Sequence, residues 1–165
     1  MNIICHGLDT PERVCFYEQD FYVLSNFSAF EITWRNKHFV TSEHAYQWEK
    51  FNGTGNDTIL HGIRAARSAH AAFKKAEEFR QYRRADWDDV KVDIMRCILC
   101  AKVEQHEYVR RKLLESGDRD LVENSWRDDF WGTGPHGDGQ NMLGELWMQI
   151  RAELVRAGGE EGGLK

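Results

Sequence analysis

The spacing of apolar residues along the chain changes near residue 42. Before that point, short aromatic and β-branched runs at residues 14–17, 21–24 and 30–34 favour extended structure. The last of these runs alternates apolar with polar side chains, and a further short run at residues 38–40 follows it across Arg35-Asn36-Lys37. A small β-hairpin near the N-terminus is therefore expected.

From Ser42 onward the apolar residues recur at helical spacing, and serine or aspartate stands at several of the starts. The pattern predicts helices over residues 42–52, 56–65, 68–81, 87–104, 106–116 and 141–157. The two prolines, Pro11 and Pro135, lie outside all of these segments. The expected fold class is mainly α, with a small N-terminal β-hairpin.

The helix predicted over residues 87–104 carries one apolar stripe. Its members are Val90, Ile94, Cys97, Ile98 and Ala101. Asp86 stands where an N-cap residue is needed, and Trp87 follows at the helix entrance. An indole at that place either anchors packing or stacks on a base or sugar at the mouth of a pocket.

Length and composition favour one domain. A chain of 165 residues with 41% hydrophobic content can build a single core, which is expected over residues 1–157, with 158–165 as a flexible tail. The N-terminus lacks a basic region followed by an apolar run, and no stretch approaches the roughly 20 apolar residues of a membrane span. A cytoplasmic protein without membrane contact is expected.

The four cysteines are too sparse for a disulfide scaffold, so reduced thiols are expected. Cys97 and Cys100 form a lone C-x-x-C, and zinc would need further ligands, which only Cys5 and His6 offer. The interpretation of Cys97 as a core thiol is favoured over a zinc or redox site. Neither a metal nor an organic cofactor is predicted.

Charge is unevenly distributed. The formal net charge of −5 argues against broad adhesion to nucleic acid. Residues 61–84 are nevertheless basic, because Glu77 and Glu78 are outnumbered by Arg64, Arg67, Lys74, Lys75, Arg80, Arg83 and Arg84. The segment is either a solvated helical face or a rim that attracts a phosphorylated or polyanionic substrate.

Two polar and aromatic stretches carry the candidate chemistry. A helix beginning at Ser42 places Glu43, Tyr46, Gln47 and Lys50 on one face. That face is either an ordinary exposed surface or part of a site. The upstream turn at Ser25 and Asn26 lies between apolar residues, where its polar groups need partners.

The second stretch contains Asp128 and Trp131 and is followed by several glycines within residues 132–144. The G-x-G-x-x-G match at residues 132–137 lacks the buried strand and the later acidic residue of a dinucleotide fold. The glycines still allow close backbone approach to a ligand, and the following helix offers N–H groups to a phosphate. The alternative is a flexible surface turn.

These residues together resemble the YbiA-like, or NADAR, family of N-glycosidases over about residues 16–154. The residues that carry the resemblance are Ser25-Asn26-Phe27, Ser42-Glu43-His44 with Gln47 and Lys50-Phe51, Trp87 with Val90-Lys91, Met95-Arg96, Lys102, Gln105-His106, Trp131-Gly132, then Gly137, Gly139, Asn141 and Leu143-Gly144. The resemblance implies a mainly helical enzyme that hydrolyses the bond between ribose C1 and nitrogen. The chain departs from the family pattern at residues 71–76.

The resemblance implies two substrate classes: ribosylamino intermediates of riboflavin synthesis, and ADP-ribose attached to guanine, including guanine in nucleic acid. It implies Glu43, Asp128 and Trp87 as the catalytic residues. The implied substrate-binding residues are Ser25, Asn26, Phe27, Gln47, Lys50, Trp131, Gly132 and Asn141. The sequence chooses neither the substrate class nor the oligomeric state.

The chemistry of N-glycosidic cleavage suits these residues, because positive charge develops on C1 and the ring oxygen and attracts a carboxylate. Glu43 is expected to stabilise that charge or to activate water, and Asp128 to orient the ribose hydroxyls or share the acid and base work. The two carboxylates are expected to face each other. Lys50 either holds a phosphate or attacks C1 of an opened sugar to form a Schiff base. A non-catalytic ADP-ribose or nucleotide reader remains the alternative.

Overall fold

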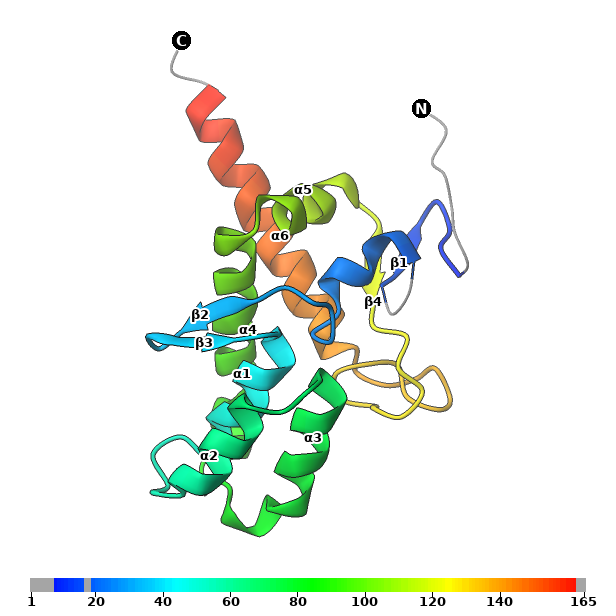
Figure 1. The fold of residues 1–165 in the computed structure, drawn as a ribbon. Coiled ribbons are helices and arrows are strands. Elements are labelled where there is room, and N and C mark those ends of the chain that lie inside the picture. Colours follow the sequence, from blue (N-terminus) through cyan, green and yellow to red (C-terminus); the bar gives the residue numbers. More distant parts are fainter. Residues whose placement is uncertain (1–7, 17–18, 163–165) are drawn as a thin grey trace. The chain divides into compact units, whose positions relative to one another are not determined.

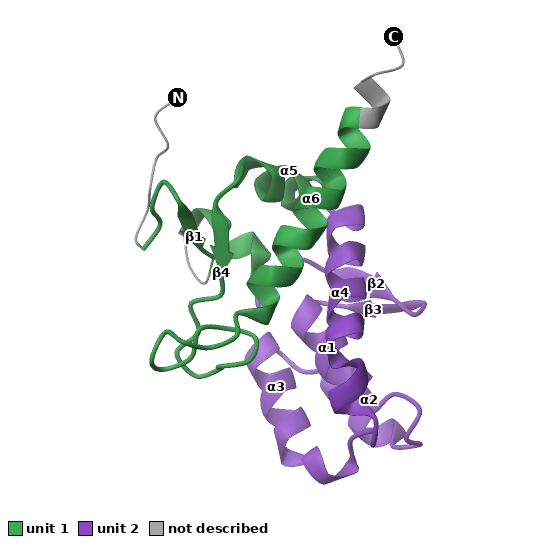
Figure 2. Ribbon diagram, turned by 180° about the vertical axis from the view of Figure 1, so that it is seen from behind, with its two compact units in different colours: residues 1–25, 107–165 green, residues 26–106 purple. Residues whose placement is uncertain are grey.

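The computed structural model describes residues 8–16 and 19–162, and it is mainly α-helical, as predicted. The chain divides into two compact units, which are described separately (Figure 2). One unit comprises residues 26–106, and the other combines residues 1–25 with residues 107–165. Within the described residues, no helix is long and apolar enough to cross a membrane. The single domain predicted over residues 1–157 stays a prediction.

The unit of residues 26–106 begins with the predicted hairpin (Figure 1). Strands β2 (Ile32–Trp34) and β3 (Lys37–Phe39) pair antiparallel, with Ile32 opposite Phe39. Arg35 and Asn36 both take positive φ, as a two-residue turn of this hand requires. The hairpin predicted from the alternating pattern is confirmed.

Helices make up the rest of this unit. They are α1 (Ser42–Glu49), α2 (Asp57–Arg64), α3 (Ala69–Glu78), the 3₁₀ turn η2 (Arg80–Tyr82) and α4 (Trp87–Gln105). The N-cap side chains of Thr41 and Ser68 accept hydrogen bonds from the backbone N–H groups of His44 and Ala71. These caps start α1 and α3 close to the predicted positions.

Helix α4 corrects two sequence expectations. Asp86 occupies the N-cap position without a capping hydrogen bond, because its carboxylate accepts from the Arg84 guanidinium at 2.6 and 2.9 Å instead. Cys97 is exposed and is therefore not a core thiol. The buried stripe is turned by about one residue and consists of Trp87, Ile94, Met95, Ile98, Leu99, Lys102 and Val103.

Glu49, at the end of α1, is a fully buried carboxylate that ties the hairpin to the helices. Trp34 Nε1 donates to its Oε1 at 2.5 Å, Arg35 Nε donates to the same oxygen, and Asn52 donates to Oε2 at 3.3 Å. We expect Glu49→Ala to lower the free energy of unfolding by about 1–3 kcal/mol, since the half-buried Trp34 and Asn52 and the more exposed Arg35 lose their buried acceptor. Urea denaturation measures this, and an unchanged midpoint would contradict the assignment.

The other unit is built from both ends of the chain. Strands β1 (Arg13–Cys15) and β4 (Asp120–Val122) pair in parallel, with Val14 opposite Leu121. Around them lie the 3₁₀ helix η1 (Gln19–Leu24) and the helices α5 (Glu107–Glu115) and α6 (Met142–Gly162). The extended structure expected at residues 21–24 is wrong, and residue 17 of the first predicted run lies outside the described residues.

Buried aromatic contacts hold η1 and α6 in this unit. The buried Phe21 ring lies beneath two cations, with Lys112 Nζ 4.8 Å and the Arg119 guanidinium carbon 5.0 Å from its centroid. The indole of Trp147, on α6, donates to the Leu24 carbonyl at 2.8 Å. Helix α6 continues to Gly162, beyond the predicted end at 157, and residues 163–165 lie outside the described part of the chain.

Candidate functional site

The face of α1 that carries the candidate chemistry is buried. Glu43, Gln47 and Lys50 are only 6%, 2% and 8% exposed, and every residue of the helix is buried. The cause is that α2, α3, α4 and the β2–β3 hairpin all pack against α1. The alternative of an ordinary exposed face is therefore wrong. Burying a carboxylate, an amide and an amine on one face costs free energy of folding unless hydrogen bonds or ion pairs compensate it.

Glu43 is held at the beginning of α1 by local hydrogen bonds. Its Oε1 accepts from Gln47 Nε2 at 2.6 Å, one helical turn further on. Its backbone N–H donates to the Asn26 carbonyl at 3.1 Å, which brings the predicted turn residue beside the carboxylate. Asn26 Nδ2 in turn approaches Met95 Sδ at 3.1 Å. The structure thus brings together three residues that the sequence predicted for the site.

Lys50 lies among aromatic rings and acidic groups. Its Nζ is 5.4 Å from the centroid of Tyr46, 5.9 Å from that of Trp87 and 3.6 Å from Glu77 Oε1. Burial lowers the pKa of the amine below its ordinary value, and the negative charges of Glu43 and Glu77 oppose that shift in part. Desolvation of this kind makes an amine available as a nucleophile nearer neutral pH.

Trp87 is nearly inaccessible in this structure, at 3% exposed, and its ring centroid lies 5.1 Å from that of Tyr46. This burial fits a packing anchor, which is one of the two roles expected at the start of α4. Its assignment as a catalytic residue that stacks on substrate stays a prediction.

Three buried polar atoms beside Glu43 have no hydrogen-bond partner among the residues that the structure describes. They are Asn26 Oδ1, Ser42 Oγ and Gln47 Oε1. A buried polar atom without a partner typically costs about 1–3 kcal/mol, so such atoms are rare unless a ligand or water completes them. Two of the three are pure acceptors. A ligand that meets their needs therefore carries hydroxyl or N–H donors.

The basic segment includes both paired and exposed charges. Arg83 pairs with Asp88 at 3.3 Å, and Arg84 pairs with Asp86 at 2.6 Å. Arg64, Arg67, Lys74 and Arg80 are exposed, which agrees with a solvated face. The alternative role of this surface, as a rim that attracts phosphates, stays a prediction.

His44 gives the α1 region a pH dependence. It is fully buried, its Nδ1 lies 2.8 Å from Thr41 Oγ1, and its Nε2 lies 3.1 Å from the Ala66 carbonyl oxygen. Burial lowers the pKa of His44, although the bond to Ala66 partly offsets the shift. Between the lowered pKa of the folded state and the unfolded value of about 6.5, the unfolded chain therefore binds a proton at His44 that the folded chain does not.

We accordingly expect the free energy of unfolding to fall as the pH drops below about 6.5, by at most about 1.4 kcal/mol per pH unit from this residue. His44→Gln removes this contribution. Urea titrations of both proteins between pH 5 and 8 measure the difference. Equal pH slopes in the two proteins would contradict the assignment.

Asp128, in the other unit, shapes the loop that carries the remaining site candidates. Its Oδ1 accepts hydrogen bonds from the backbone N–H groups of Phe130 and Trp131 at 2.9 and 2.8 Å. The two rings pack edge to face, with centroids 4.9 Å apart. This carboxylate is half-buried and is structurally engaged through one oxygen. Its catalytic role stays a prediction.

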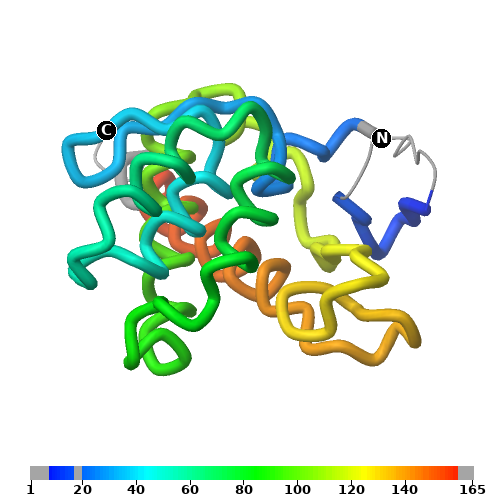
Figure 3. Tube along the Cα trace, turned by 60° about the horizontal axis from the view of Figure 1, so that its bottom comes forward, coloured from blue at the N-terminus to red at the C-terminus, as the bar shows by residue number. Residues whose placement is uncertain are grey.

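The glycine-rich loop, which contains Gly132, Gly134, Gly137 and Gly139, folds tightly onto itself before α6 (Figure 3). A Cβ at Gly139 would stand 2.5 Å from the Gly132 carbonyl oxygen, so glycine is required for backbone packing there. The N–H groups of Met142 and Leu143 donate to the carbonyls of Phe130 and Trp131. Those two N–H groups are therefore not available to a phosphate, and the expectation that the start of this helix binds one stays a prediction.

Asn141 acts as a clamp between this loop and β4. Its Nδ2 donates to the Leu121 carbonyl at 2.9 Å, and its Oδ1 accepts from the Glu123 N–H at 2.9 Å. Two other predicted substrate-binding residues belong to different units. Ser25 is buried in the unit of residues 1–25 and 107–165, and Phe27 is exposed in the unit of residues 26–106.

Within the described residues, no cluster of histidine, cysteine, aspartate and glutamate is able to hold a metal ion. Cys5 and His6, the further ligands considered for zinc, lie outside those residues. The exposed Cys97 and half-buried Cys100 therefore have no described partner set for a structural zinc site.

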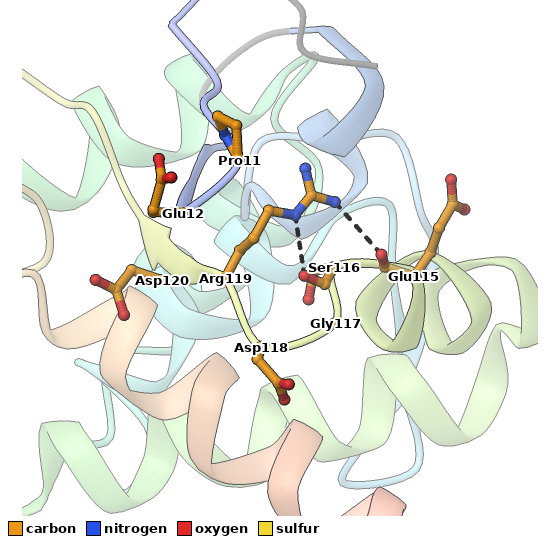
Figure 4. Close-up of a pocket in the computed structure, with 8 residues that line it drawn as sticks. All are labelled: Pro11, Glu12, Glu115, Ser116, Gly117, Asp118, Arg119 and Asp120. Carbon is orange, nitrogen blue, oxygen red and sulfur yellow. Dashed lines mark hydrogen bonds between the residues drawn. The ribbon is translucent and has the colours of Figure 1, made fainter. Parts of the chain in front are cut away.

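A hollow of about 550 Å³ lies beside β4 and the end of α5 (Figure 4). It is lined by Pro11, Glu12 and residues 115–120, none of which is a predicted site residue. Arg119 directs two guanidinium nitrogens to the carbonyls of Ser116 and Glu115, at 3.0 and 3.4 Å. The surrounding carboxylates of Glu12, Glu115, Asp118 and Asp120 disfavour a phosphate at this place.

Two contributors to the α1 region were missed by the sequence analysis. Glu77, on α3, approaches Lys50, and Ser42 adds one of the unpartnered buried atoms. Glu77 was counted only as a charge within the basic segment, and no local pattern connects it with Lys50, 27 positions earlier in the printed sequence. Ser42 was considered as a helix start and as part of the motif that carries the family resemblance, but not as a site residue.

Comparison with known proteins agrees with this architecture. The chain is 37% identical to the N-glycosidase YbiA of Escherichia coli, over 82% of this chain and 83% of that protein. It is 38% identical to an N-glycosidase of Nostoc punctiforme, over 86% of this chain and 92% of that one. The solved structure of the Escherichia coli protein YbiA matches with a TM-score of 0.79 and 34% identity, covering 90% and 89% of the two chains.

A riboflavin biosynthesis protein of Vibrio vulnificus is 37% identical over 87% of this chain, which spans only 39% of that longer protein. The NADAR domain family matches residues 15–155. At the level of enzyme class, the expectation of an N-glycosidase is confirmed by these relatives. The chain belongs to the NADAR domain family.

Proposed function

We propose that this protein hydrolyses the bond between C1 of a phosphorylated ribose and a nitrogen atom, with Glu43 as the central catalytic group. The observation that carries the proposal is the buried face of α1, where Glu43 stands among unpartnered acceptors of Asn26 and Gln47. Ribose offers hydroxyl donors that meet such acceptors. The N-glycosidases among the relatives support the same reaction class.

Glu43 is suited to this reaction by its charge and its setting. Cleavage of the C–N bond places positive charge on C1 and the ring oxygen, and a fixed carboxylate stabilises that charge more strongly than it stabilises the neutral sugar. Its hydrogen bond from Gln47 holds the carboxylate in place before the reaction. The same group is able to take a proton from the attacking water.

Lys50 has two candidate roles, and burial among Tyr46, Trp87 and Glu77 is relevant to both. A charged amine would hold a phosphate. An uncharged amine would attack C1 of the opened sugar, displace the substrate nitrogen as a free amine and form a Schiff base, which water then hydrolyses to release the sugar and restore the lysine amine. The lowered pKa favours the second role more than the sequence alone did. Reduction with borohydride separates the roles, because it traps only a Schiff base as a stable secondary amine.

The remaining assignments complete the proposal. Asp128 orients the ribose hydroxyls or takes part in general acid and base catalysis. Trp87 and Trp131 bind the base or the ribose of the substrate. Asn141 supports the loop through its bonds to Leu121 and Glu123. The reaction takes place in the cytoplasm and requires no metal or organic cofactor.

Two substrate classes fit the proposed reaction: ribosylamino intermediates of riboflavin biosynthesis, and ADP-ribose attached to guanine, free or in nucleic acid. The relative from Vibrio vulnificus, a riboflavin biosynthesis protein, supports the first class. The exposed basic side chains of α2, α3 and η2 suit a substrate with several phosphates and therefore support the second.

The test is to incubate the purified protein with both classes and to identify the released sugar and nitrogen compound. Release of the two products in equal amounts from one class supports the proposal and selects the substrate. Tight binding of ribosyl compounds without any release would contradict hydrolysis and would leave a non-catalytic reader as the function.

A further inference from the structure

We propose that Trp126 is a stacking platform for the heteroaromatic base of the substrate, an inference that rests on the proposed function. Trp126 is 61% exposed, although tryptophan has one of the largest apolar side-chain surfaces and is usually buried for the most part. It precedes Asp128 by two positions in the printed sequence.

The backbone on both sides of Trp126 is anchored. The preceding residue, Ser125, accepts a hydrogen bond from the Gly134 N–H at 3.0 Å through its carbonyl. Two positions further on, Asp128 Oδ1 accepts from the N–H groups of Phe130 and Trp131. Trp126 and Arg127 are therefore presented between two fixed points. A fixed backbone reduces the entropy that a ligand must remove when it orders the loop.

The indole is already oriented on one side. The Arg127 guanidinium carbon lies 4.4 Å from the centroid of the ring, within the distance of a cation–π contact. A planar guanidinium over one face holds the ring, and the high exposure of Trp126 leaves surface for a second planar group. A ring held in this manner suits stacking on a base of any identity, because every nucleobase has a π-face.

The chemistry of the substrate gives this platform a role in specificity. Both proposed substrate classes join ribose to a nitrogen heterocycle, or carry one in an attached nucleotide. Ribose 5-phosphate lacks any such ring. Trp126 would therefore distinguish ligands with a base from ligands with the sugar phosphate alone, while Asp128 on the same loop is assigned to the sugar.

The test compares the binding of ADP-ribose and ribose 5-phosphate by isothermal titration calorimetry. Trp126→Ala should weaken ADP-ribose binding about 5- to 150-fold, the range expected for losing one base stack, and leave ribose 5-phosphate binding unchanged. Trp126→Phe should restore most of the affinity. Tyr108→Ala is the matched control, because Tyr108 is another exposed ring of the same unit with an arginine 5.1 Å from its centroid.

Unchanged ADP-ribose binding in Trp126→Ala would overturn the proposal, and so would equal weakening of both ligands or equal loss in Tyr108→Ala. A wild-type protein that fails to bind ADP-ribose would also overturn it. Failure of the proposed function is recognised separately, as wild-type protein that binds ADP-ribose through Trp126 and cleaves no N-ribosyl compound.

Discussion

Glu43→Gln should lower kcat about 10²- to 10³-fold while leaving substrate affinity nearly unchanged. The substitution keeps the shape of the side chain and an oxygen that accepts from Gln47, so the local packing of α1 is preserved. It removes the negative charge that stabilises the oxocarbenium-like transition state and the base that activates water. Because the charge acts mainly in the transition state, the loss appears in kcat.

The matched control is Glu78→Gln, which removes a carboxylate from an exposed position on α3. It should change neither kcat nor KM. Rates are measured as release of the nitrogen product, with calorimetry for affinity and urea denaturation for folding. A Glu43→Gln protein that keeps full kcat would remove Glu43 from the mechanism, whatever else the chain does.

Gly144→Ala should destabilise the protein by about 2–4 kcal/mol, because no space exists for a methyl group. A Cβ at this position would collide with the Leu121 carbonyl oxygen and stand 2.5 Å from Asn141 Nδ2. These are the atoms that join β4 to the glycine-rich loop and to α6. The melting temperature should fall by roughly 5–15 °C, as measured by circular dichroism.

Gly158→Ala on the same helix is the control, because a Cβ there meets nothing within 4 Å. Alanine is the better helix former, so this variant should be unchanged or more stable by up to about 1 kcal/mol. Equal melting temperatures for Gly144→Ala and the wild type would show that the contact between α6 and β4 is looser than described.

The sequence predicted those parts of the fold that depend on local pattern. The β2–β3 hairpin followed from alternation and a turn at Arg35 and Asn36, which take the positive φ that the turn needs. The helix starts at Ser42 and near Ser68 followed from serine and threonine caps. These features are decided within a few residues, so a single sequence contains the necessary information.

Other parts depend on distant residues and were missed. The parallel pairing of β1 with β4 joins segments about a hundred positions apart, for which no local pattern exists. The aromatic run at residues 21–24 reads as a strand by propensity, yet Phe21 packs beneath Lys112 and Arg119 in a 3₁₀ helix. Tertiary contacts therefore outweighed local preference.

The candidate site shows the same division. Helical spacing correctly placed Glu43, Gln47 and Lys50 on one face of α1, but it left open whether that face was exposed. Burial depends on α2, α3 and α4, which come later in the chain, together with the β2–β3 hairpin. The apolar spacing predicted a buried stripe on α4 that included Cys97. In the structure Cys97 is exposed, and the buried side chains include Leu99 and Lys102 instead. Lysine is counted as polar in a hydrophobicity pattern, so the pattern does not reveal that Lys102 is buried.

The central claim is that the buried polar face of α1 binds the anomeric carbon. Its most direct test is a crystal structure of the Glu43→Gln variant with an intact N-ribosyl substrate that the wild type cleaves. We predict that C1 lies within about 4 Å of the side chain at position 43, close to near-attack distance, with the ribose hydroxyls bonded to Asn26 and Gln47. A bound substrate whose C1 lies away from α1 would contradict the account.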